Sequence, residues 1–261
     1  MEIFKLLDKS NCRECQEPTC LAFAGAVFRG QKRLDECPNL ESEIIEQYGG
    51  KAGNKISLEA ELDEAVEQLK SKITTVDLSS AAQRLGAKFS DEKLTIEVLG
   101  KDFTVDSEGN ITTNIHVHSW IAIPALNYIM NGSGSSVSGE WVPFRELKGG
   151  KTWYRLFGQM CEKRIKEVAD TYTDLFEDMI RIFNGRQVEN HYASDISLVL
   201  HPLPKVPILI CYWRAEDELE SNLNIFFDAT VEENLNIESI YTLGTGIAIM
   251  FKKIAQSHGQ Q

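Results

Sequence analysis

Residues 12–20 read CRECQEPTC, and Cys37-Pro38 follows after a further 16 residues. The four cysteines therefore have the spacing Cys12-x2-Cys15-x4-Cys20-x16-Cys37. Three thiolates come from one tight loop, and the fourth returns after a segment that reads as a helix and a turn. This spacing indicates a small module folded around a ligand that the four thiolates share.

Four soft thiolates suit either zinc or an iron-sulfur cluster, so the ligand set alone leaves both open. Zinc ribbons and fingers usually pair two CxxC motifs or include histidine. Here there is one CxxC motif, and the first histidine of the chain is His116. A proline directly after the last cysteine also occurs in bacterial ferredoxins. These features favour an iron-sulfur cluster over zinc or free thiols.

The segment after the third cysteine predicts a helix over residues 20–29, with Thr19 as its N-cap and Gly30 as its stop. Its small and apolar side chains can cover a cluster and exclude water. A second short helix is expected over residues 42–48.

Residues 12–24 (CRECQEPTCLAFA), closing with residues 35–38 (DECP), closely resemble the 4Fe-4S domain of the corrinoid/iron-sulfur protein large subunit. A similar module is found in the B subunit of Rnf electron-transport complexes. The resemblance implies that Cys12, Cys15, Cys20 and Cys37 ligate one low-potential 4Fe-4S cluster, which in the corrinoid protein is associated with reducing cobalt. The family usually has glycine after the second cysteine. Gln16 stands there in this chain, and it would strain the backbone if that turn is left-handed.

The chain has 261 residues, of which 43% are hydrophobic and 25% charged, as in a folded globular protein. It is long enough for a small module and a domain of ordinary size. Residues 49–54 (GGKAGN) are the most linker-like stretch. The sequence therefore predicts a cluster module at 1–48, a linker at 49–57 and a second domain at 58–261.

An α+β fold is expected, in which the small cysteine-rich helical module precedes a larger domain with an antiparallel sheet and several helices. Apolar periodicity predicts helices over residues 58–70, 78–85, 120–130, 152–170, 172–183 and 237–254, with Pro124 in the first turn of the third. Strands are expected over residues 93–99, 103–105, 196–200 and 206–213. Residues 131–136 (NGSGSS) are flexible by composition and predict a mobile loop.

From about residue 58 the chain resembles an uncharacterised prokaryotic family that often follows such an iron-sulfur module and has no established activity. The matching pieces are residues 203–208 (LPKVPI), 212–218 (YWRAEDE) and 226–228 (FFD). This resemblance supplies no mechanism.

Three carboxylates of the second domain, Asp217, Glu218 and Asp228, are candidates for acid/base chemistry near the end of a hairpin. The structural alternative is the stronger one, because an acidic loop after a strand is usually a solvated turn and Asp228 can cap a helix.

Other candidate ligands stand alone. His116 and His118 would share one face of a strand, but no third ligand lies beside them. His201 is a candidate axial ligand for cobalt or haem iron, with an ordinary structural histidine as the alternative. Cys161 and Cys211 lie in apolar stretches and are expected to be buried thiols rather than nucleophiles.

The formal net charge is -12, and residues 1–40 carry six basic and six acidic side chains, so the acidity belongs to the rest of the chain. An acidic body repels phosphate backbones and anionic lipids, so neither nucleic acid nor a membrane surface is expected as a partner. The N-terminus lacks the apolar core of a signal peptide, and no apolar run is long enough for a membrane span. A cytoplasmic location is expected.

Three functions remain open, and whether the protein is an enzyme is open as well. The first is a 4Fe-4S electron-transfer or redox accessory protein that serves a redox protein partner, by resemblance a corrinoid protein. The second is a protein whose large domain binds a corrinoid or other tetrapyrrole, with the cluster as its internal reductant. The third is an interaction module in which the metal has a purely structural role.

Overall fold

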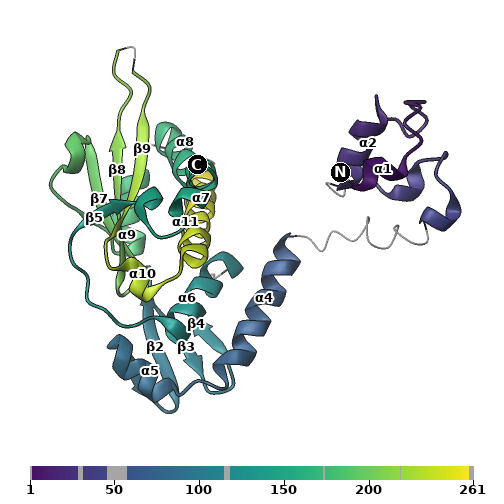
Figure 1. Ribbon diagram of the computed structural model, residues 1–261. Coiled ribbons are helices and arrows are strands. Elements are labelled where there is room, and N and C mark those ends of the chain that lie inside the picture. Colours follow the sequence, from purple (N-terminus) through teal and green to yellow (C-terminus); the bar gives the residue numbers. More distant parts are fainter. Residues whose placement is uncertain are drawn as a thin grey trace. The chain divides into compact units, whose positions relative to one another are not determined.

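The computed structural model describes residues 2–28, 32–45, 58–114, 118–172, 174–217 and 219–258. The chain divides into two compact units, Met1–Leu62 and Asp63–Gln261, which are coloured purple to blue and blue to yellow in Figure 1. The predicted linker lies outside the described residues. Helices and antiparallel sheets together make up the second unit, which confirms the α+β class.

The first unit contains helices and turns around the cysteines. Helix α1 spans Glu2–Leu6, helix α2 spans Cys20–Phe28, and the 3-10 turn η1 spans Leu34–Glu36. The helix predicted after the third cysteine is therefore confirmed, and residues 42–45 of the second predicted helix are helical. A small apolar cluster, in which Phe23, Val27 and Leu34 are almost fully buried, includes Cys15, Cys20 and Cys37.

Helix α4 (Leu58–Ile73) crosses the boundary between the units, and the second unit continues with helix α5 (Leu78–Leu85) and a four-stranded antiparallel meander. Its strands are β1 (Lys88–Ser90), β2 (Lys93–Val98), β3 (Lys101–Asp106) and β4 (Ile111–Thr113). In the central pair Leu94 lies opposite Val105 and Ile96 opposite Phe103, and all four are buried. This alternation is the one that predicted the strands.

A five-stranded antiparallel sheet in the order β5-β9-β8-β7-β6 forms the centre of the unit. Its strands are β5 (Trp141–Pro143), β6 (Arg186–Gln187), β7 (Ile196–Leu203), β8 (Val206–Trp213) and β9 (Asn222–Asp228). The predicted hairpin of β7 and β8 is confirmed. Strands β5, β6 and β9 were not predicted.

Helices cover one face of this sheet (Figure 1). They are α6 (Ser119–Asn131), α7 (Gly150–Phe157), α8 (Lys163–Thr171), α9 (Leu175–Phe183), the short α10 (Val231–Asn234) and the long α11 (Ile237–His258). A π-helical turn, η3 (Gly158–Glu162), joins α7 to α8, so the predicted helix over 152–170 is one helix interrupted by a wide turn. Pro124 lies inside α6 rather than in its first turn.

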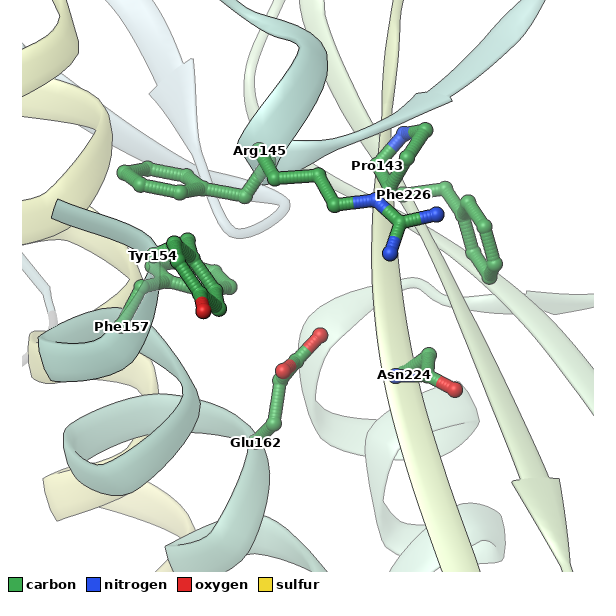
Figure 2. A pocket seen from close by; sticks show the side chains of 8 residues that line it. Pro143, Arg145, Tyr154, Phe157, Glu162, Asn224 and Phe226 are labelled. Atoms are coloured by element: carbon green, nitrogen blue, oxygen red, sulfur yellow. The ribbon is translucent and has the colours of Figure 1, made fainter. Parts of the chain in front are cut away.

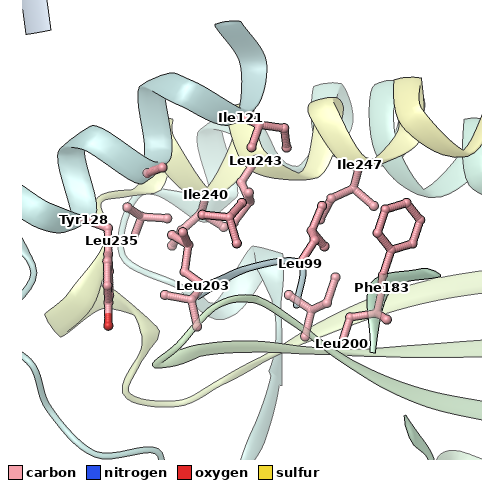
Figure 3. Close-up of a cluster of buried hydrophobic side chains, with 14 of the residues drawn as sticks. Leu99, Ile121, Tyr128, Phe183, Leu200, Leu203, Leu235, Ile240, Leu243 and Ile247 are labelled. Carbon is pink, nitrogen blue, oxygen red and sulfur yellow. The ribbon is translucent and has the colours of Figure 1, made fainter. Parts of the chain in front are cut away.

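Helix α11 contains Gly244 and Gly246, which lower its helix propensity, and close packing against neighbouring helices explains why glycine stands there. A Cβ on Gly246 would lie 2.8 Å from Ile121 Cδ1 and 3.1 Å from the Trp120 carbonyl oxygen of α6. A Cβ on Gly244 would lie 2.8 Å from Phe157 Cε2. Glycine therefore allows α11 to approach α6 and α7 closely. Figure 3 shows α6 and α11 projecting Ile121, Leu243 and Ile247 into the buried core above the sheet.

Hydrogen bonds connect residues 131–136, the predicted mobile loop, to neighbouring elements. The Ser133 N–H donates to the Glu233 carbonyl (2.9 Å), and the Gly134 N–H donates to Asn234 Oδ1 (3.0 Å). The Lys205 ammonium donates to the Gly134 carbonyl. None of the helices in the described part of the chain combines the length and apolarity that a membrane crossing requires.

Candidate metal centre

The loop that carries the first two cysteines has an unusual backbone. Asn11 (φ 53°), Arg13 (φ 65°) and Gln16 (φ 64°) adopt left-handed conformations, whereas the cysteines between them do not. The Gln16 N–H donates to the Arg13 carbonyl (2.9 Å) and closes the turn. Gln16 thus occupies the left-handed turn anticipated from its replacement of the usual glycine, at a cost of about 1–2 kcal/mol.

Alternation of left-handed and right-handed residues turns successive N–H groups toward one side of the chain, and such concavities bind anions, including many iron-sulfur clusters. Asn11 shows the effect directly. Its N–H donates to Cys20 Sγ (3.3 Å), while its side-chain oxygen accepts from the Cys20 N–H (2.8 Å). Asn11 therefore fixes the third cysteine through both its backbone and its side chain. Asn11 was not among the predicted site residues, although asparagine is one of the residues that best tolerate a left-handed position after glycine.

Helix α2 places Cys20 at its first residue. Thr19 is the N-cap as predicted, because its hydroxyl accepts a hydrogen bond from the Ala22 N–H (3.1 Å). On its N-terminal side Asp8 Oδ1 lies 3.8 Å from Cys20 Sγ, and hydrogen bonds from the Ser10 N–H and hydroxyl lower the pKa of this carboxyl. The helix start, with its free N–H groups, is a favourable position for a thiolate.

Cys37 returns to the loop directly after η1. Its N–H donates to the Leu34 carbonyl (3.3 Å), and the Asn39 side-chain amide donates to Cys12 Sγ (3.2 Å). Burial raises the pKa of the Cys37 thiol, and the neighbouring Cys15, Asp8 and Cys12 raise it further. A coordinated metal reverses this tendency, because a bound cation deprotonates the thiol outright.

The four cysteines differ in exposure. Cys15, Cys20 and Cys37 are 6–7% exposed and belong to the small apolar cluster, whereas Cys12 is exposed. A lysine stands beside the site: Lys32 Nζ donates to the Cys15 carbonyl (2.9 Å) and pairs with Glu36 (3.2 Å). Three buried thiols and one exposed thiol would leave a bound cluster open to solvent on the Cys12 side.

Within the described ranges, no three His, Cys, Asp or Glu side chains converge tightly enough to hold a single metal ion. A four-iron cluster places each thiolate on a different iron, so its ligands stand around a body larger than one ion. The four thiols, the Asn11 N–H directed at Cys20 Sγ and the apolar cluster that includes three of the cysteines suit such an anionic cluster.

The other candidates from the sequence have structural surroundings. Asp228 is fully buried, and its carboxylate accepts from the backbone N–H groups of Ser138, Gly139 and Thr230 and from the hydroxyls of Ser138 and Thr230. Despite its burial, these bonds lower its pKa to about 2. It anchors a loop and caps no helix. Asp217 lies in the exposed turn of the β8–β9 hairpin, and Glu218 lies outside the described residues.

His201 is exposed on β7 and contributes to a cavity of 250 Å³ with Phe183 and Pro204. Drug-sized ligands occupy about 300–1,000 Å³, so a corrin or haem ring does not fit there. Partial desolvation, and then the nearby Arg186 charge, lower the pKa of His201. His118 directly precedes α6, and His116 lies outside the described residues.

Cys161 and Cys211 are fully buried, as the sequence predicts. Burial raises the pKa of the Cys161 thiol to about 12 and also raises that of Cys211. Neither thiol is a reactive nucleophile in this setting.

The cysteine-rich unit is similar to known proteins. A family model described as "Putative Fe-S cluster" matches residues 7–39. The chain is 40% identical over 47 residues to the acetyl-CoA decarbonylase/synthase complex subunit gamma of Methanocaldococcus jannaschii, covering 18% of this chain and 10% of that protein. It is 42% identical over 57 residues to the corrinoid/iron-sulfur protein large subunit of Moorella thermoacetica, covering 22% and 13%. The predicted resemblance is confirmed, and the chain spans about a tenth of the length of these relatives.

The second unit matches a different model. A family described as "Domain of unknown function (DUF3786)" matches residues 77–250, as the predicted resemblance to an uncharacterised family requires. No solved structure is significantly similar to the chain.

Proposed function

The chain belongs to the family described as a domain of unknown function (DUF3786), which supplies no activity, and we propose that the protein transfers electrons through a 4Fe-4S cluster in its N-terminal unit. The proposed ligands are the four predicted cysteines, Cys12, Cys15, Cys20 and Cys37. We further propose that this module corresponds to residues 1–48, that residues 49–57 link it to the family domain, and that residues 58–261 form that domain.

The observation that carries the proposal is the cysteine loop itself. Left-handed residues at Asn11, Arg13 and Gln16 alternate with the ligands, and the Asn11 N–H already donates to a cysteine sulfur. N–H groups directed at sulfur stabilise the reduced, more negative cluster, and the hydrogen bonds, net charge and exposure of a cluster set its potential. Lys32 donates to the Cys15 carbonyl, but Glu36 pairs with its charge, so the proposal depends on the hydrogen bonds to sulfur.

The exposure pattern supports electron transfer rather than a purely structural metal. A structural zinc site is normally closed on all sides. Here Cys12 is exposed, with its sulfur bonded only by the Asn39 amide among the described contacts. A cluster bound there would have one edge at the surface, where a partner could accept the electron.

We propose a cobalt corrinoid protein as that partner. The support is the similarity to a corrinoid/iron-sulfur protein subunit and to a subunit of an acetyl-CoA decarbonylase/synthase complex. Because the net charge of -12 lies outside the first 40 residues, the family domain favours a partner with a basic surface.

The test is anaerobic purification of the full chain, followed by iron and acid-labile sulfide analysis and by EPR after reduction with dithionite or titanium(III). We expect about four irons and four sulfides per chain and an EPR signal that appears only on reduction. One equivalent of zinc without sulfide would contradict the cluster, and a cluster that no low-potential donor reduces would contradict electron transfer. Mixing the reduced protein with a cobalt(II) corrinoid protein and following the visible band of cobalt(I) then tests the partner.

A further inference from the structure

A cavity of 280 Å³ opens in the family domain at a place that no sequence motif marks. Figure 2 shows the side chains that surround it. They come from three separate parts of the chain: residues 143–145, residues 154–162 and residues 224–226.

The cavity lies where the sheet edge becomes open. Strand β5 pairs with β9 from Trp141 opposite Asp228 to Pro143 opposite Phe226, and the chain then turns into η2 (Phe144–Glu146). Beyond Phe226, β9 has no β5 neighbour. Its next outward N–H group, that of Ile225, donates instead to Glu162 Oε1 (3.0 Å).

Glu162 reaches this position from the π-helical turn η3. The Lys163 N–H bonds to the Gly158 carbonyl, five residues back, which marks the inserted residue. Such wide turns inside α-helices are rare and are frequent at functional sites. Desolvation by burial raises the pKa of Glu162, although bonds from the Ile225 N–H and the Asn224 side chain oppose the shift. Its acid form is therefore more accessible than that of an exposed glutamate.

Arg145 forms the opposite wall. In Figure 2 its guanidinium extends across the cavity mouth, between Phe226 and Glu162. It is exposed and makes no ion pair with any residue that the structure describes. An exposed arginine without an ion pair can donate two parallel N–H bonds from its planar guanidinium to a carboxylate.

Aromatic rings complete the walls. Phe144 stacks on Phe157 with centroids 4.1 Å apart and an interplanar angle of 5°. On the other side Phe226 stacks on Tyr192 with centroids 4.3 Å apart. These contacts fix the rings. Because Phe144 and Phe157 are only 3% and 1% exposed, a flat ligand would meet the more exposed rings of Tyr154 and Phe226.

We propose that this cavity binds a small planar organic acid whose carboxylate pairs with the Arg145 fork and whose ring lies against the aromatic walls. A second polar group of the ligand would meet Glu162 and Asn224. The volume of 280 Å³ is near the lower end of ligand pockets, which limits the ligand to about one ring. The site lies in the family domain and does not depend on the iron-sulfur proposal.

The test uses 4-fluorobenzoate as a probe of the full-length protein, with its fluorine signal followed by NMR. We expect a dissociation constant of about 1 mM or tighter for the wild type. Arg145→Gln should weaken binding at least about tenfold, because it removes the paired charge. Arg155→Gln is the matched control, since Arg155 is an exposed arginine of α7 that does not line the cavity.

A second variant must act in the opposite direction. Glu162→Gln keeps an oxygen acceptor for the Ile225 N–H and removes the negative charge that repels the probe, so we expect binding to tighten by about threefold. No binding to the wild type at a few millimolar, equal affinity of the wild type and Arg145→Gln, or weakening by both variants would overturn the proposal. Uncharged 4-fluorobenzyl alcohol should not distinguish the wild type from Arg145→Gln, and a preference equal to that of benzoate would also overturn it.

Discussion

The two units of the chain are stabilised in different ways. In the first unit the described core cluster contains six buried apolar side chains besides the cysteines, with five partly buried ones packed against it, and the ligands of the proposed cluster lie close together in sequence. The family domain has a large continuous core and two antiparallel sheets. Small domains that bury little apolar surface commonly depend on a metal for folding, whereas a large core is sufficient by itself. The sequence of the first unit therefore predicts its chemistry, whereas the sequence of the second unit predicts mainly which residues are buried.

The largest expected effect is that of Cys20→Ser. Cys20 begins α2, lies against Asn11 and is a proposed ligand, so its loss should remove the cluster and unfold the first unit. Iron and sulfide analysis and thermal unfolding followed by circular dichroism measure the two consequences. We expect iron near zero and an unchanged main unfolding transition of the family domain.

Cys161→Ala is the control for Cys20→Ser, because Cys161 is a buried cysteine of the other unit. It should lower the stability of the family domain and leave the iron content unchanged. If Cys20→Ser unfolded the family domain as well, the two units would not be independent in stability. If it kept a cluster with the wild-type EPR spectrum, Cys20 would not be a ligand, since a serine oxygen in its place would change the spectrum.

Gly246→Val tests the second unit in the same way. Its Cβ would approach Ile121 and Trp120 of α6 too closely, so α11 must shift or α6 must move away. We expect a loss of about 3 kcal/mol in the free energy of unfolding of the family domain, measured by urea denaturation, with the iron content unchanged. Lys252→Val, at an exposed position of the same helix, measures the β-branched penalty alone and should cost about 0.5 kcal/mol. Equal effects of the two variants would contradict close packing at Gly246.

Much of the family domain was predictable from the sequence, because periodicity reports which face of an element is buried. Helices α4, α5, α6 and α11 and the hairpin of β7 and β8 follow their predicted ranges closely. Strands β5 and β9 were missed. Strand β5 has only three residues, with no alternation to detect. Strand β9 does alternate, with Leu223, Ile225 and Phe227 buried, but its asparagines are depleted in strands and weaken that signal.

The two candidate sites also differ in how far they could be predicted from the sequence. The cysteines could be found because their chemistry is rare and their spacing is short. The cavity between Arg145, Glu162 and Asn224 could not, since each of these residue types is common and the fold alone brings them together. In the first unit, too, Asn11 and Lys32 were missed because they act through backbone atoms of the loop.

Asp228→Asn tests a carboxylate that was a catalytic candidate from the sequence. In the structure this carboxylate anchors a loop by hydrogen bonds. The pKa of Asp228 is about 2 in the folded protein, below its ordinary value of 3.8, so its ionised form stabilises the fold. This contribution is complete above pH 4 and is lost as the pH falls from about 4 to about 2. We expect the variant to lose about 2 kcal/mol at pH 7, measured by urea denaturation, and the difference from the wild type to shrink toward pH 2. A difference that stays constant with pH would show that charge is not the cause.

The smallest expected effect concerns the cysteine loop. Gln16 holds a left-handed conformation that glycine adopts without steric cost, so Gln16→Gly should remove about 1–2 kcal/mol of strain. The greater freedom of glycine in the unfolded chain offsets part of this gain, leaving about 0.5–1 kcal/mol. The measurement is the rate at which the visible absorption of the cluster is lost in the presence of an iron chelator. We expect this loss to be slower for Gln16→Gly than for the wild type. Glu14→Gly is the matched control, because Glu14 lies in the same loop and has no left-handed backbone to relieve, so it should speed the loss. If both glycines accelerated the loss, the left-handed turn at Gln16 would not be a source of strain in the cluster-bound protein.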